Sequence, residues 1–97
     1  MEYSLVWTPE ARSTLEEVVS YLDKANPQAG DKLLMQVDRS LSLIIRMPFM
    51  YTAIPEKAGL RRCLVGRHIA MYYRIDGGQV TLLSFFDTRQ DPASFNP

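Results

Sequence analysis

The hydrophobic residues in the first half of the chain predict one strand followed by two helices. Tyr3–Trp7 is short, β-prone and roughly alternating, which is typical of a strand. Thr8, Pro9 and Glu10 then read as a helix start, with Thr8 as the cap, Pro9 in the first turn and Glu10 at the positive end of the dipole. Apolar residues follow at helical spacing, at Ala11, Leu15, Val18, Val19 and Leu22.

A second helical pattern starts after residues 23–26 interrupt the first. Asn26 and Pro27 repeat the signal of a cap followed by proline. Pro48 disfavours helical geometry at Met47, so we expect the helix to end near Arg46. Its apolar positions are Ala29, Leu33, Val37, Leu41, Ile44 and Ile45, widened by Leu34 and Met35. Because only a few residues join the two helices, they should form an antiparallel hairpin.

Beyond Gly59 the hydrophobic spacing changes to two, which predicts strands at 60–65, 67–75 and 79–86. Gly66 separates the predicted strands 60–65 and 67–75, and a glycine at this position is compatible with a β-bulge. Asp76-Gly77-Gly78 is a strong hairpin turn, because glycine accepts the positive φ that tight turns require. Residues 49–58 have no period and are predicted to form a loop, and a polar tail occupies about 88–97.

The predicted order is therefore β-α-α-β-β-β in a single α+β domain spanning residues 1–97. Consecutive hairpin-capable strands form an antiparallel sheet, and the helical hairpin must cover one face of it. The first strand is expected at the sheet edge or beside the last strand. The core face of 67–75 should carry Ile69, Met71, Tyr73 and Ile75, while Arg67, Ala70, Tyr72 and Arg74 take the other face.

Composition excludes several classes of protein. A hydrophobic fraction of 46% in 97 residues excludes a disordered chain, and no apolar run approaches the ~20 residues of a membrane span. The N-terminus shows no secretory signal, and the lone Cys63 fits a reducing compartment, so we expect a cytoplasmic protein without a membrane partner.

The net charge of zero hides an asymmetry along the chain. Residues 1–50 carry five basic and seven acidic residues, whereas residues 51–97 carry six and four. Between Lys57 and Arg74 there are five basic residues and no acidic one. Screening limits each charge to about 8–10 Å, so this stretch makes a positive surface whatever the net charge. The alternative is a solvated strand face that only keeps the sheet soluble.

Few residues suit catalysis. One His and one Cys cannot build a metal site, and no cofactor motif is present. His68 in mid-strand is better explained as a partly buried or edge residue than as a base, and Cys63 as a small core residue. Asp87, Asp91 and Glu56 could pair, but nothing in the sequence brings them together.

The arginines are the remaining candidates, since a guanidinium binds phosphate or carboxylate through two parallel hydrogen bonds. We expect binding of a nucleic acid or of an acidic protein segment at Arg61, Arg62, Arg67, Tyr72, Arg74 and Arg89. If the protein is an enzyme, the weak catalytic candidates are Arg61, Arg67, His68 and Arg89.

Short segments spread over residues 5–92 form a recognisable ordered set. They are Trp7-Thr8-Pro9-Glu10-Ala11 with Leu15, Asn26-Pro27-Gln28-Ala29, Leu43 to Pro48, Gly59-Leu60-Arg61-Arg62, Val65-Gly66-Arg67-His68-Ile69, Tyr72-Tyr73-Arg74-Ile75 with Asp76-Gly77-Gly78, and Arg89-Gln90-Asp91-Pro92. In this set the chain resembles toxins of the RelE/ParE superfamily, the toxic halves of bacterial type II toxin–antitoxin modules. The resemblance implies the same β-α-α-β-β-β order.

The superfamily divides by activity. RelE-like members cut mRNA on the ribosome without a metal, whereas ParE-like members poison DNA gyrase. Here Phe95 stands where a tyrosine hydroxyl would serve, Phe86-Asp87 fills a slot often held by an aromatic residue or histidine, and Asp87 would repel phosphate. Metal-free RNA cleavage needs an acid, a base and charge stabilisation. The resemblance therefore favours a ParE-like gyrase inhibitor over a RelE-like endoribonuclease, with a detoxified interaction protein as a third reading.

All three readings imply a protein antitoxin as partner and no cofactor. The resemblance implies an antitoxin tail, partly disordered when free, that wraps the helical hairpin and the sheet. It is also compatible with a homodimer.

Overall fold

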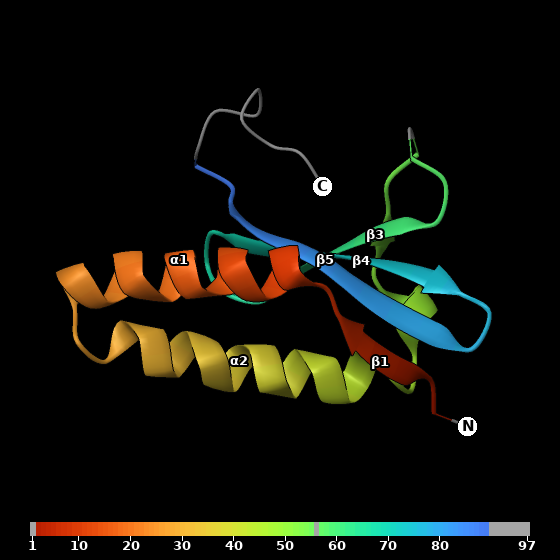
Figure 1. The fold of residues 1–97 in the computed structure, drawn as a ribbon, viewed down its shortest axis with the longest axis horizontal. Coiled ribbons are helices and arrows are strands. Elements are labelled where there is room, and N and C mark those ends of the chain that lie inside the picture. Colours follow the sequence, from red (N-terminus) through yellow and green to blue (C-terminus); the bar gives the residue numbers. More distant parts are fainter. Residues whose placement is uncertain (1, 56, 90–97) are drawn as a thin grey trace.

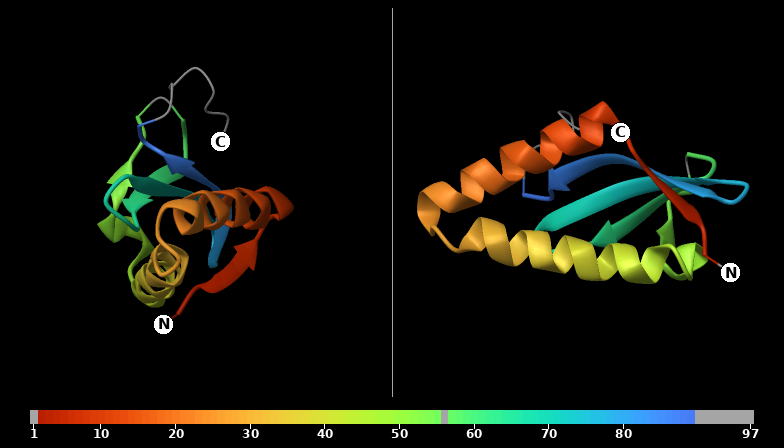
Figure 2. Two further views of the ribbon diagram at one scale, coloured as in Figure 1. Left: turned by 90° about the vertical axis from the view of Figure 1, so that its left-hand side faces the viewer. Right: turned by 60° about the horizontal axis from the view of Figure 1, so that its bottom comes forward.

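Two helices lie against one face of a five-stranded sheet (Figure 1). The computed structural model describes residues 2–55 and 57–89. The elements are β1 (Ser4–Trp7), α1 (Pro9–Ala25), α2 (Ala29–Ile44), the 3₁₀ turn η1 (Pro48–Met50), β2 (Thr52–Ala53), β3 (Leu60–Leu64), β4 (Ile69–Asp76) and β5 (Gln79–Asp87). The α+β class and the helical hairpin on one sheet face are confirmed, and Figure 2 shows the two layers from the side.

The sheet is mixed, with strand order β1-β5-β4-β3-β2. β3, β4 and β5 pair antiparallel as predicted, β2 adds an unpredicted antiparallel pairing with β3, and β1 runs parallel to β5. The three-strand meander leaves the edges of β3 and β5 unpaired, and an edge strand gains stability from a partner. β1 pairs with the free edge of β5. The sequence left two positions open for this strand, the sheet edge and the side of the last strand, and β1 occupies both at once because it is the edge strand next to β5.

The segment 49–58, predicted as a loop, contains structure that periodicity missed. It begins inside η1 and continues into β2, whose Thr52 and Ala53 pair with Arg62 and Arg61. A two-residue strand is too short to produce an alternating pattern, so only its pairing with β3 reveals it. The expected tail at 88–97 lies outside the described residues from position 90 onward.

The two helix starts differ. The Thr8 cap is confirmed, since its Oγ1 accepts a hydrogen bond from the Ala11 N–H (3.1 Å) and donates one to the Leu82 carbonyl (2.7 Å). The cap predicted at Asn26 is wrong, because α2 begins three residues later, at Ala29. Asn26 Oδ1 instead accepts from the N–H of Gln28 (3.1 Å), which closes the turn between the helices.

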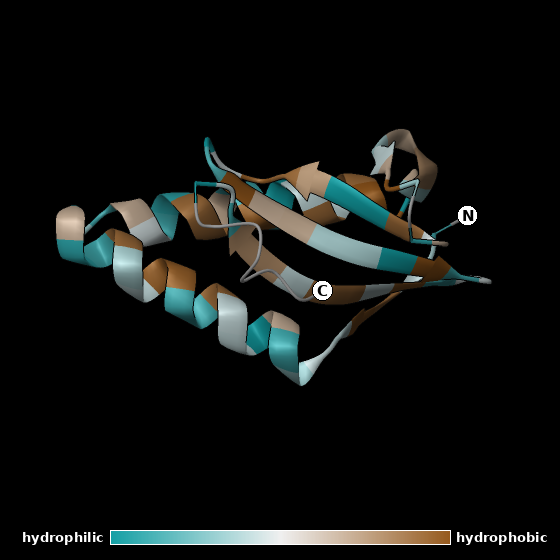
Figure 3. Ribbon diagram, turned by 90° about the horizontal axis from the view of Figure 1, so that it is seen from above, coloured by the Kyte–Doolittle hydropathy of each residue, from teal (hydrophilic) through white to brown (hydrophobic). Residues whose placement is uncertain are grey.

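The helix-facing side of β4 is as predicted. Ile69, Met71 and Tyr73 are buried in the main core and Ile75 packs against it. The strand starts at Ile69 rather than at 67, and the irregularity lies between Tyr72 and Tyr73 in the pairing with β5, not at Gly66. In Figure 3, hydrophobic and hydrophilic residues recur in turn along both helices and are also mixed along the strands.

Candidate binding surfaces

Arg61 lies on the helix-facing side of the sheet, opposite Tyr73 in the register. Its Nη1 donates to the carbonyl oxygens of Tyr51 (2.7 Å) and Phe49 (3.3 Å). The guanidinium also stands 5.0 Å from the centre of the Phe49 ring, within the range of a cation–π contact. This arginine therefore holds the chain that follows α2 through Nη1, which is one of the three nitrogens of its guanidinium.

Arg62, Tyr72 and Arg74 lie on the opposite face of the sheet. In the sheet register Arg62 pairs with Tyr72, and Arg74 pairs with Leu60. The two arginines are exposed, whereas the Tyr72 side chain is only 6% exposed. Tyr72 belongs to a second apolar cluster with Leu60 and Ala70, against which Ile54, Leu83 and Phe86 pack. The middle of this face is therefore apolar rather than basic.

Arg67, His68 and Arg89 meet at one end of the sheet, where the turn 66–68 faces α2. They line a pocket of about 190 Å³ together with Lys32 and Gln36. The apolar walls of this pocket are Leu22, Ala29, Leu33 and Ile69. The His68 carbonyl accepts hydrogen bonds from the backbone N–H (2.7 Å) and the hydroxyl (3.1 Å) of Thr88, and these bonds hold the end of β5 against the turn.

Asp87 and Arg89 form an ion pair beside this pocket. Arg89 Nη2 donates to Asp87 Oδ2 (2.7 Å), while its Nε and backbone N–H donate to Oδ1 at 3.0 and 2.9 Å. These bonds lower the pKa of the nearly buried Asp87 carboxyl. The repulsion of phosphate expected from Asp87 is therefore offset locally by its own partner. The two other carboxylates weighed with it, Glu56 and Asp91, lie outside the described residues.

A groove of about 780 Å³ runs along α1 and α2. Its apolar lining comes from Trp7, Leu15, Val19 and Leu34, and its charged rim from Arg12, Glu16, Asp23 and Lys24. Leu34 is 42% exposed, and Trp7 stacks on Phe85 at a ring distance of 6.0 Å. The sequence analysis did not predict a site at these residues. One signal was present, because Leu34 lies beside the apolar stripe that packs α2 against the core and so indicated an exposed apolar position on this helix.

Cys63 is a buried core residue, as expected, and burial raises the pKa of its thiol. Among residues 2–55 and 57–89 there is no group of three side chains suited to a metal ion. Over the same ranges, no helix is long and apolar enough to cross a membrane.

A family model described as the ParE toxin of the type II toxin–antitoxin system parDE matches residues 5–92. The chain belongs to the ParE toxin family. It is therefore a toxin of a ParDE-type toxin–antitoxin system, as the ordered segments suggested, and toxins of type II systems bind a protein antitoxin. No curated protein matches the sequence.

Two solved structures share the fold of this ParE-family chain. A chain of the chromosomal ParDE toxin–antitoxin system from P. aeruginosa superposes with a TM-score of 0.72 at 18% identity, over 87% of this chain and 94% of that one. The YoeB dimer from Staphylococcus aureus gives a TM-score of 0.60 at 13% identity, with the same 87% and 94% coverage. At these identities the likeness shows the fold alone.

Proposed function

We propose that this ParE-family toxin inhibits DNA gyrase in the cytoplasm and that a cognate antitoxin neutralises it. The observation that carries the proposal is the match of residues 5–92 to the ParE toxin family model, and the separation of Arg61 from the other three candidate catalytic residues supports it. Arg61 is bound to the chain after α2, while Arg67, His68 and Arg89 lie at the opposite end of β3. The sheet face away from the helices has an apolar centre, and RNA cleavage there would need an acid and a base close together.

The test is a gyrase supercoiling assay run beside in vitro translation with the same purified protein. We expect supercoiling to be blocked at micromolar toxin while translated mRNA stays intact by primer extension. Codon-dependent cuts with unaffected supercoiling would contradict the proposal.

Ribosome-dependent mRNA cleavage is the second candidate, and one observation favours it: His68 shares a pocket with Arg67 and Arg89. In that reading the arginines hold phosphates and His68 carries a proton. His68→Ala would then abolish the cuts, whereas it should leave gyrase inhibition unchanged under the main proposal. A detoxified protein, expressed without antitoxin, would not arrest growth either as the wild type or as the His68→Ala variant.

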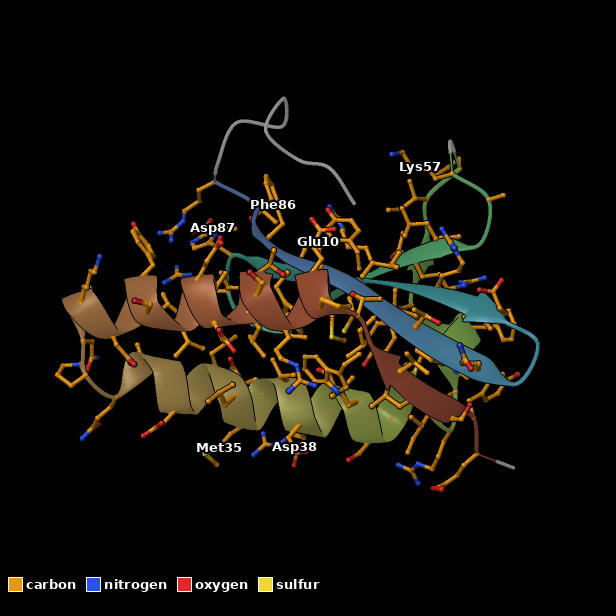
Figure 4. All side chains as sticks on the ribbon, viewed as in Figure 1. Glu10, Met35, Asp38, Lys57, Phe86 and Asp87 are labelled. Carbon is orange, nitrogen blue, oxygen red and sulfur yellow. The ribbon has the colours of Figure 1, made fainter. Side chains whose placement is uncertain are left out.

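We propose the groove along α1 and α2 as the binding site of the antitoxin. Apolar walls from Trp7, Val19 and Leu34 beneath a rim of both charges suit an amphipathic helix, and such a partner should bury more than ~1,000 Å². Met35 is 63% exposed and points away from the sheet (Figure 4), so it provides a matched control on the same helix.

The corresponding experiment compares Leu34→Glu with Met35→Glu. We expect Leu34→Glu to prevent copurification of the antitoxin and Met35→Glu to leave it unchanged. Equal retention of the antitoxin by both variants would show that the partner binds elsewhere.

A further inference from the structure

The pocket beside the turn 66–68 combines a basic rim with an apolar interior. Lys32 from α2, Arg67 from the turn and Arg89 from the end of β5 supply three cationic side chains around a space of about 190 Å³. The only carboxylate in direct contact with them among the described residues is Asp87, and Arg89 already binds both of its oxygens. The rim therefore keeps an excess of positive charge.

The interior of the pocket is suited to one side chain. Its volume equals that of about six water molecules at ~30 Å³ each, which is the size of a medium apolar residue. Leu22, Leu33 and Ile69 would surround such a residue, and burial of its apolar surface supplies the affinity that exposed ion pairs alone do not.

The arrangement of the other arginines argues against a nucleic-acid ligand here. A nucleic-acid backbone presents a row of phosphates and is bound by a continuous basic track. Arg62 and Arg74, the exposed arginines of the strands, lie on the sheet face turned away from α2, whereas the pocket lies on the α2 side. The exposed strand arginines therefore do not continue the cations of the pocket into a basic track.

From these observations we infer that this pocket binds an acidic segment of a protein partner, in which an apolar anchor residue enters the pocket and a neighbouring Asp or Glu meets Lys32 and Arg67. The site is separate from the groove along α1 and α2, since the two share no lining residue. It does not depend on whether gyrase or the ribosome is the target, and it extends the binding surface to a second side of α2.

The test selects short random peptides, displayed on phage, against the purified full-length protein. We expect the enriched peptides to place an apolar residue next to Asp or Glu. A synthetic copy of the best peptide should bind about fivefold or more weakly to Arg67→Glu and to Lys32→Glu, because each reversal turns an attraction into a repulsion. Replacing the acidic residue of the peptide with its amide should weaken binding to the wild type in the same way.

Arg74→Glu is the matched control, since it makes the same charge change at an exposed arginine on the other face. Its effect on peptide binding should stay below about twofold. Circular dichroism confirms that each variant is folded. The inference is overturned if no peptide is enriched, if the enriched peptides lack acidic residues, or if Arg74→Glu weakens binding as much as Arg67→Glu. It is equally overturned if a single-stranded RNA or DNA oligonucleotide displaces the peptide and responds to the same reversals.

Discussion

Substituting Arg61 with alanine should destabilise the fold, because this side chain bonds to the chain after α2 rather than to a ligand. The bond from Nη1 to the Tyr51 carbonyl, at 2.7 Å, is charge-assisted and contributes about 1.5 kcal/mol at a half-buried position. The second bond, to Phe49 at 3.3 Å, is too long to add much. The contact with the Phe49 ring adds about 0.5–1 kcal/mol. The expected loss in the free energy of unfolding is therefore about 2 kcal/mol.

Urea denaturation followed by circular dichroism measures this loss. For a domain of this size it corresponds to a midpoint about 1 M lower in urea. Arg62→Ala is the control, because Arg62 is the next residue along β3, is exposed, and its side chain makes no hydrogen bond or ion pair with the part of the chain that the structure describes. Equal midpoints for Arg61→Ala and Arg62→Ala would refute the reasoning and return Arg61 to the set of free binding residues.

Three further predictions rest on single contacts. Thr8→Ala should cost about 1–2 kcal/mol in a urea titration, while Thr8→Ser keeps most of the stability because its hydroxyl can still cap α1. The pKa of Asp87 is lowered in the folded state, so its pairing with Arg89 stabilises the fold above the ordinary carboxyl pKa of about 3.9 and loses this effect as the pH falls through the folded-state value. The stability advantage of the wild type over Arg89→Gln should thus be present at pH 7 and absent in strong acid; a constant difference would disprove the link. Ser84 is 4% exposed and its hydroxyl has no hydrogen-bond partner within residues 2–55 and 57–89, so Ser84→Ala should leave stability unchanged or raise it by up to about 1 kcal/mol, and a loss of that size would contradict this reading.

The elements with a sustained pattern were predictable from the sequence. Both helices carry several apolar turns, and β4 alternates over a run that includes Ile69 and Tyr73, so periodicity located them. β2 was not predictable, because two residues carry no period. The parallel pairing of β1 was also hidden, since it depends on which sheet edge lacks a partner.

The candidate site was predictable only in part. The arginines between 57 and 74 are neighbours in the sequence, but strand alternation turns Arg61 toward the helices and Arg62 toward the other face. Arg67 belongs to a turn and so meets Lys32 of α2, a residue that no local pattern connects with it. The groove likewise joins Trp7 and Leu34, which come from different elements. Contacts of this kind follow from packing and are absent from any short window of sequence.

The pairing of β1 with β5 also governs when this protein can fold. Ser4 pairs with Gln79, so β1 cannot form its strand pairing until nearly the whole chain has been synthesised. Closing the long loop between two such distant strands costs conformational entropy before the contact adds any stability, and this cost slows folding. While the chain is being synthesised, the helical hairpin has no finished sheet to cover, and the apolar sides of α1 and α2 stay open to other proteins. A nascent chain stopped before β5 would therefore carry both helices without the core that holds them together.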